Sequence, residues 1–144
     1  MDSANENSII GNKQIVGYLL ETSKWAKFLA IIGYVGIGII VLMALFASVI
    51  FSSLSQTAQI PFPSGVFTFI YLLIAVCYYF PVAYLYKFSQ QMKKGLTSGD
   101  TNAITLGFEN LKSHYKFMGI FMIVVLSLYG VIFVFGFLFS MLRF

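Results

Sequence analysis

The chain has 144 residues, of which 59% are hydrophobic, 18% aromatic and only 10% charged. A soluble domain usually carries about 25% charged residues, so this composition excludes an ordinary soluble protein and indicates one dissolved in lipid. The formal net charge is +4, but the basic residues flank apolar stretches, which argues against a nucleic-acid partner. Cys77 is the single cysteine, so an intrachain disulfide and a cysteine-rich metal site are excluded.

Residues 8–27 mix apolar and polar side chains at roughly helical spacing, as in Ile15, Val16, Leu19 and Leu20. This pattern predicts an N-terminal amphipathic helix at the inner membrane surface. Its apolar face could enter the lipid headgroup region or dock on the segment that follows the second span. Contact with lipid is the simpler interpretation and the one we favour.

No charged residue occurs between Lys27 and Lys87, an interval that accommodates two membrane crossings of about 20 residues each. Serines and then two prolines interrupt it, which predicts an uncharged loop over residues 52–65. A further apolar run follows Lys116. Continuous apolar runs are typical of transmembrane helices, whereas barrel strands alternate polar and apolar residues. The predicted spans are residues 28–51, 66–86 and 117–142.

Residues 87–116 connect the second and third spans and read as helical. We expect a break over residues 95–99 and a new helix that begins at Asp100, whose carboxylate suits an N-cap. The third helix would then carry an apolar stripe from Ile104 through Phe108 to Leu111.

The predicted fold class is all-α: one membrane domain over residues 1–144, with three transmembrane helices, the amphipathic helix and a cytoplasmic helical extension between spans two and three. Eight of the nine basic residues lie before the first span or between the second and third, and only Arg143 lies beyond the third. Positive residues concentrate on the cytoplasmic side of membrane proteins. The amino terminus is therefore expected in the cytoplasm and the carboxyl terminus outside.

Small residues recur in the first and third spans and allow helices to approach closely. Either contact within one chain or association with another chain would use them. The candidate packing residues are Ala26, Ala30, Gly33, Gly36, Ala44, Ser48, Gly136 and Ser140. Pro81 lies inside the second span and lacks an N–H, so we expect a helix kink there and a free carbonyl at Cys77.

The basic residues near the inner membrane surface are expected to contact anionic lipid headgroups. These candidates are Lys87, Lys93, Lys94, Lys112 and Lys116. Tyr78 and Tyr79 lie deeper in the second span, so their hydroxyls need a neighbouring helix or a small hydrated pocket.

No arrangement typical of catalysis is present, and we predict no catalytic, cofactor-binding or metal-binding residues. His114 is the only histidine and has no second histidine or thiol beside it, so it cannot complete a zinc site. We interpret it as an interfacial polar residue beside Lys112 and Lys116. No acidic residue falls inside a span, which argues against an ion-coupled carrier acting as a monomer.

Two parts of the sequence stand out together. The first is Glu21-Thr-Ser-Lys-Trp-Ala-Lys-Phe-Leu-Ala-Ile-Ile-Gly33, and the second is Tyr84-Leu-Tyr-Lys-Phe-Ser89, followed by Asp100 and then Phe108-Glu-Asn-Leu-Lys-Ser-His-Tyr-Lys-Phe-Met-Gly-Ile120. They resemble small membrane proteins of Bacteroidota that form a domain family of unknown function. The resemblance begins near Tyr18 and covers most of the chain. It implies a short multispan protein of the bacterial inner membrane, with no established reaction and no catalytic residues to transfer.

Three functions fit the sequence. The first is a non-enzymatic inner-membrane scaffold or accessory subunit that contacts membrane lipids and either a protein partner or itself. The second is a homo-oligomeric channel or carrier, with Thr68, Tyr78, Tyr79 and Ser127 as candidate lining residues. The third is a lipid-active enzyme at the inner interface that would use His114 with Asp100 or Glu109.

Overall fold

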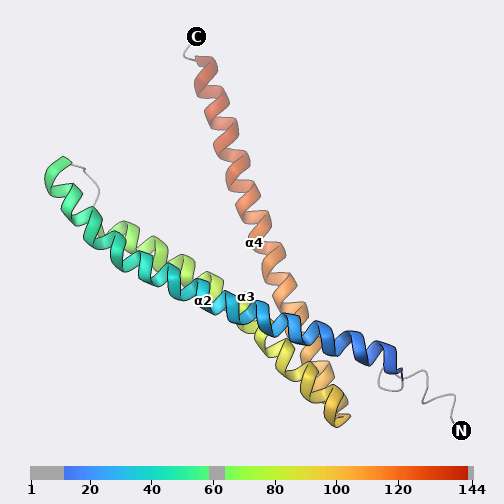
Figure 1. Ribbon diagram of the computed structural model, residues 1–144. Coiled ribbons are helices and arrows are strands. Elements are labelled where there is room, and N and C mark those ends of the chain that lie inside the picture. The colour runs from blue at the N-terminus through green and yellow to red at the C-terminus, as the bar shows by residue number, and fades with distance from the viewer. Residues whose placement is uncertain (1–11, 59–63, 143–144) are drawn as a thin grey trace, which may run out of the picture.

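The computed structural model describes residues 12–58 and 64–142, which form three long helices (Figure 1). They are α2, Lys13–Ala58; α3, Ser64–Ser98; and α4, Thr101–Leu142. At 1.5 Å per residue, even the 35 residues of α3 extend about 50 Å, well beyond the roughly 30 Å hydrocarbon core of a bilayer. Each helix therefore has room to cross a membrane and to continue past its surface.

The helices contain stretches apolar and long enough to cross a membrane: Lys13–Ile50, Thr68–Ser98 and Thr101–Met141. This finding confirms the predicted all-α class with three helices of transmembrane type.

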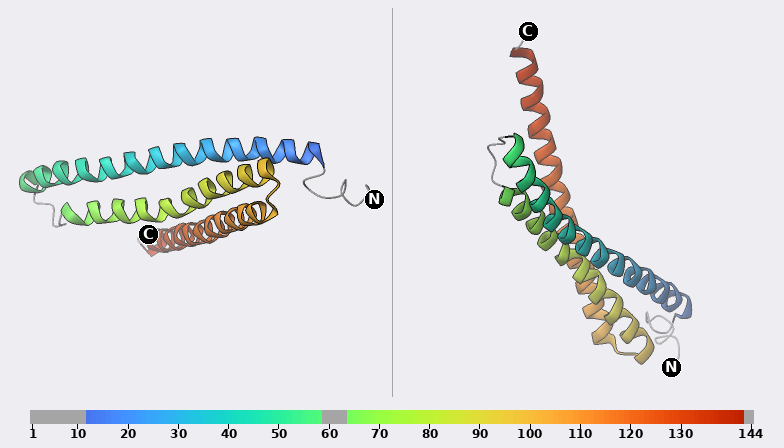
Figure 2. Two further views of the ribbon diagram at one scale, coloured as in Figure 1. Left: turned by 90° about the horizontal axis from the view of Figure 1, so that it is seen from below. Right: turned by 60° about the vertical axis from the view of Figure 1, so that its left-hand side comes forward.

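The middle helix of the chain, α3, is also central in space. It packs antiparallel to α2 along the shared length of the two helices, and it packs against the first part of α4. Beyond that contact α4 turns away from the α2–α3 pair, as the two orientations in Figures 1 and 2 show. The start of α2, the end of α3 and the start of α4 lie together, and we call this the lysine-rich end.

The hydrophobic core lies at the lysine-rich end, where all three helices meet. Its buried residues are Ala26, Phe88, Met92, Leu96 and Ile104. Full burial of side chains such as Phe88 and Met92 stabilises a fold by about 1.5–3 kcal/mol each. Val16, Leu19 and Leu20 at the start of α2 pack against this core. The amphipathic stretch thus packs on the segment after the second span. From the sequence, contact with lipid was the favoured alternative.

Two predicted helix boundaries differ from the structure. The amphipathic stretch is not a separate surface helix, because α2 continues unbroken from Lys13 into the first apolar run; residues 8–11 lie outside the described residues. The predicted loop at residues 52–57 is also helical. The hydroxyls of Ser52 and Ser53 donate to the carbonyl of Val49, at 2.8 and 3.1 Å, so these serines bond back onto the helix. Of the remaining predicted loop, residues 59–63 are not described and residues 64–65 begin α3.

The connection between α3 and α4 is shorter than the predicted break, because α3 continues to Ser98. Gly99 has φ +70°, a left-handed conformation that favours glycine, and the Asp100 N–H donates to the Gly95 carbonyl at 3.0 Å. Asp100 Oδ1 then accepts from the N–H groups of Asn102 and Ala103, at 3.0 and 3.3 Å. The predicted N-cap is confirmed, and it lets α4 fold straight back onto α3.

Gly95 is required inside α3 by the close approach of α4. A Cβ atom at this position would lie 2.6 Å from Ile104 Cγ1 and 2.7 Å from the Ile104 backbone nitrogen. Gly107 of α4 faces Met92 in a similar but looser contact, since a Cβ atom there would lie 3.3 Å from the Met92 nitrogen. These glycines allow the two helices to approach at the lysine-rich end.

Candidate functional site

The candidate packing residues of α2 and α4 fall into two different environments. Ala26, Ala30 and Ala44 are buried, and a Cβ atom at Gly33 would lie 2.7 Å from a methyl carbon of Val82 on α3. This part of α2 is therefore a close contact within the chain. Gly36 and Ser48 are half-buried, and the Ser48 hydroxyl donates to the Leu45 carbonyl at 2.7 Å.

Gly136 and Ser140, by contrast, are exposed. They belong to the outer segment of α4, which we define as residues 122–141. Every residue of this segment is exposed except Val125, which is half-buried. A Cβ atom at Gly130 or Gly136 would meet nothing within 4 Å. The small residues of this segment therefore take no part in helix packing within the described chain.

His114 connects α4 to α3 through a polar contact that the sequence did not predict. Its Nδ1 lies 2.8 Å from the carbonyl oxygen of Pro81. A carbonyl can only accept, so Nδ1 carries the hydrogen and donates it. His114 precedes the third apolar run by three residues and Pro81 lies six residues before Lys87. In a pair of antiparallel helices, His114 and Pro81 would therefore lie at a similar depth in the membrane. Their similar depth could have predicted the contact.

The same contact bears on the acid–base pairing considered for a lipid-active enzyme. Asp100 lies at the start of α4, 14 residues before His114, so the two residues are about 20 Å apart along the helix axis. The Asp100 carboxylate caps α4. Glu109 is exposed. The structure gives His114 a backbone carbonyl as its Nδ1 partner, so Asp100 is not the residue that orients its ring.

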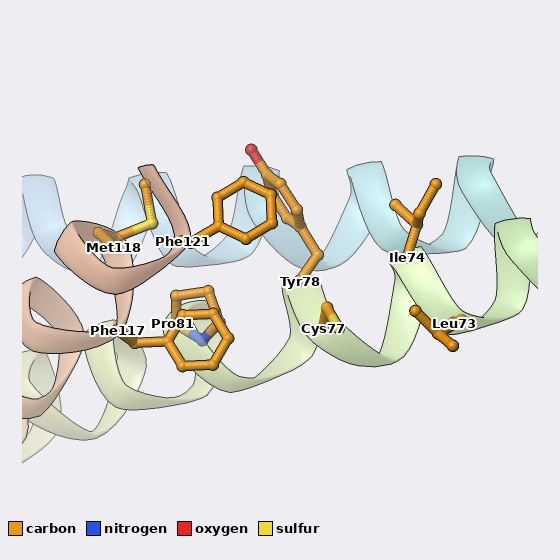
Figure 3. A pocket seen from close by; sticks show the side chains of 8 residues that line it. All are labelled: Leu73, Ile74, Cys77, Tyr78, Pro81, Phe117, Met118 and Phe121. Atoms are coloured by element: carbon orange, nitrogen blue, oxygen red, sulfur yellow. The ribbon is translucent and has the colours of Figure 1, made fainter. Parts of the chain in front are cut away.

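Pro81 lies inside α3, which is helical on both sides of it, and the kink stays a prediction. A cavity of about 140 Å³ adjoins it at the point where α4 begins to leave α3 (Figure 3). The lining is almost wholly apolar, so water would find few hydrogen-bond partners there. The lining residues are Leu73, Ile74, Cys77, Tyr78 and Pro81 of α3, and Phe117, Met118 and Phe121 of α4.

A larger open groove of about 640 Å³ lies between the α2–α3 pair and the first part of α4. Tyr78 and His114 are the polar side chains of a lining that is otherwise apolar. The lining residues are Leu29, Ile32, Gly33, Gly36, Ile39, Ile40, Tyr78, Pro81, Val82, Leu85, His114 and Met118.

The candidate pore-lining residues are dispersed over the chain. The rings of Tyr34 and Tyr79 lie 6.1 Å apart, between α2 and α3, and Tyr78 faces the two cavities beside α4. The Thr68 hydroxyl is buried and has no hydrogen-bond partner in the described part of the chain. Ser127 is exposed on the outer segment of α4. The structure therefore does not bring Thr68, Tyr78 and Ser127 to one surface.

The five candidate lipid-contacting lysines are all exposed, but they are not equivalent. Lys93 and Lys94 line a polar pocket of about 270 Å³ together with Lys27 from α2. Lys87, Lys112 and Lys116 lie outside this pocket. In the sequence, Lys27 is only one of the basic residues that orient the chain. Its position beside Lys93 and Lys94 was not predicted, because only the packing of α2 on α3 brings them together.

Groups of three or more side chains able to hold a metal ion are absent from residues 12–58 and 64–142. Comparisons of the sequence with protein-family models and curated proteins, and of the structure with solved structures, give no match. The fold and composition alone thus define the class: an all-helical protein whose three helices are suited to spanning a membrane.

Proposed function

We propose that this chain is a non-enzymatic scaffold or accessory subunit of a bacterial inner membrane, with its amino terminus in the cytoplasm. In this role the outer segment of α4 binds a transmembrane helix of another protein. One observation carries the proposal: Gly136 and Ser140, four residues apart in this segment, are exposed, and a Cβ atom at Gly136 would meet nothing within 4 Å in the described part of the chain. Small residues at this spacing are typical of closely packed helix interfaces in membranes.

The glycines of the helices give a second reason to expect a partner, because each glycine lowers the stability of its helix. A glycine inside a helix destabilises it by roughly 0.5–1 kcal/mol relative to alanine. At Gly33 and Gly95 the structure contains a close contact that offsets this cost, because a side chain there would collide with α3 or α4. At Gly130 and Gly136 the described part of the chain contains no such contact. A helix from outside the chain would supply it.

The test is extraction of the tagged full-length protein from its native membrane under gentle conditions, followed by identification of the proteins that remain bound. The variant Gly136→Leu, combined with Ser140→Leu, is expected to lose a stoichiometric foreign protein by about tenfold or more. Val134→Leu is the matched control, because residue 134 lies on the opposite side of the same helix from residue 136. Equal retention by all variants, or no foreign protein with the native sequence, would contradict the proposal.

A homo-oligomeric channel or carrier is the second candidate, because a second copy of this chain could equally cover the exposed outer segment of α4. Extraction of a closed homo-oligomer without a foreign protein would place this candidate first, and ion or solute flux unchanged by the protein in liposomes would exclude it.

A further inference from the structure

The polar pocket at the lysine-rich end is formed by two helices. Four of its residues lie on one face of α3, because the positions 90, 93, 94 and 97 follow the spacing of i, i+3, i+4 and i+7. The pocket is completed by Lys27, which belongs to α2, and by Ser89. Its lining residues are Lys27, Ser89, Gln90, Lys93, Lys94 and Thr97.

The charge in this pocket has one sign. Three ammonium groups border it, and no carboxylate lines it in the part of the chain that the structure describes. Like charges held close together on a helix surface destabilise it. Because Lys27, Lys93 and Lys94 line one pocket, an anion bound there would offset the repulsion between their charges.

The hydrogen-bonding groups indicate which anion would fit. The Thr97 hydroxyl already donates to the carbonyls of Lys93 and Lys94, at 2.8 and 3.1 Å, so it cannot donate to a ligand at the same time. The three ammonium groups, the Gln90 amide and the hydroxyl of Ser89, which is only 3% exposed, are donors. A tetrahedral phosphate presents several acceptor oxygens to such a set of donors. The volume of about 270 Å³ equals that of several water molecules at about 30 Å³ each, enough for a phosphate group.

The depth of the pocket matches that of a lipid headgroup. Lys27 directly precedes the first apolar run, and Trp25 beside it is 61% exposed, with its ring edge-on to Phe28 at 5.9 Å. Tryptophan is enriched where the bilayer core meets water. We propose that this pocket binds a phosphate-bearing anion, the chemistry that phospholipid headgroups share with soluble phosphate esters. This inference does not depend on the scaffold function.

The proposal is tested with the full-length protein in nanodiscs, by native mass spectrometry of the lipids that stay bound. Nanodiscs contain either phosphatidylcholine alone or phosphatidylcholine mixed with phosphatidylglycerol. Replacement of Lys27, Lys93 and Lys94 by Gln is expected to reduce retention of phosphatidylglycerol by about tenfold or more. The control replaces Lys13 and Lys24 by Gln, which removes exposed positive charge from α2 outside the pocket, and it should keep most of the bound lipid.

A second pair of variants separates loss of the pocket from loss of the fold. Lys27→Gln removes one pocket charge, and Lys24→Gln removes a neighbouring exposed charge from the same helix but outside the pocket. Both should leave the helical circular dichroism unchanged, and only Lys27→Gln should weaken lipid retention. Equal losses in both pairs would mean that diffuse surface charge causes the effect and would overturn the proposal. It would also be overturned if the native sequence neither retained phosphatidylglycerol nor responded to glycerol phosphate.

The source of the phosphate is decided in nanodiscs of phosphatidylcholine alone. The single tryptophan, Trp25, lies two residues from Lys27 and reports on this region. A change in its emission on addition of glycerol phosphate, abolished by the pocket substitutions, would assign the site to soluble phosphate esters. Retention of phosphatidylglycerol without a response to glycerol phosphate would assign it to lipid headgroups.

Discussion

The lysine-rich end and the outer segment of α4 both contain large apolar side chains, but the surroundings of these side chains are opposite. Phe88 and Met92 are almost completely buried where three helices meet, whereas Phe133 of the outer segment is 76% exposed. A soluble protein could not leave so much apolar surface uncovered. In a membrane lipid can cover it, so hydrophobicity alone does not distinguish packed from unpacked regions. The position of small residues and polar contacts carries that information.

The largest expected effect separates the two regions directly. Phe88→Ala removes a fully buried ring from the core and should lower the free energy of unfolding by about 3–5 kcal/mol. Phe133→Ala removes the same atoms from an exposed position and should change it by less than about 0.5 kcal/mol. Unfolding by sodium dodecyl sulfate in mixed micelles measures both values. Similar losses for the two variants would show that the outer segment is packed within the monomer.

A smaller difference is expected between two glycines. Gly95→Ala forces a methyl group against the backbone of Ile104 and should cost about 1–3 kcal/mol in the same unfolding assay. Gly130→Ala meets nothing within 4 Å and should be neutral or stabilising by up to about 1 kcal/mol in the isolated monomer. A neutral Gly95→Ala variant would contradict the close approach of α3 and α4.

The smallest effect concerns the hydrogen bond between α3 and α4. His114→Ala leaves the Pro81 carbonyl without its side-chain donor and should cost about 0.5–1.5 kcal/mol. Ser127→Ala, on the exposed outer segment, is the control and should have no measurable effect. If His114→Ala is as neutral as the control, His114 has the interfacial role that its sequence context suggested.

The three apolar helices were predictable because long uncharged runs can form little else in a bilayer. The Asp100 N-cap was predictable because its hydrogen bonds are local. The end of the first span was predicted wrongly for a physical reason: Ser52 and Ser53 bond back to Val49, so a serine-rich stretch stays helical. Gly95 likewise marks a close contact inside a helix, where the sequence pattern indicated a break.

Less of the candidate site could be predicted from the sequence, because the site depends on tertiary contacts. The sequence predicts Lys93 and Lys94 as lipid contacts, but Lys27 joins them only through the packing of α2 on α3. The contact between His114 and Pro81 joins residues 33 positions apart. The small residues showed where helices could pack closely, but only the structure separates Ala30, buried within the chain, from the exposed Gly136.

The most direct test of the central claim compares photo-crosslinking from two positions of α4 in native membranes. A photoreactive amino acid replaces Phe137 on the outer segment or Met118, which lines the groove beside α3. We expect a foreign-protein adduct from position 137 and crosslinks within the chain from position 118. Adducts from position 137 that contain only lipid would contradict it and would leave the outer segment as a lipid-facing membrane anchor.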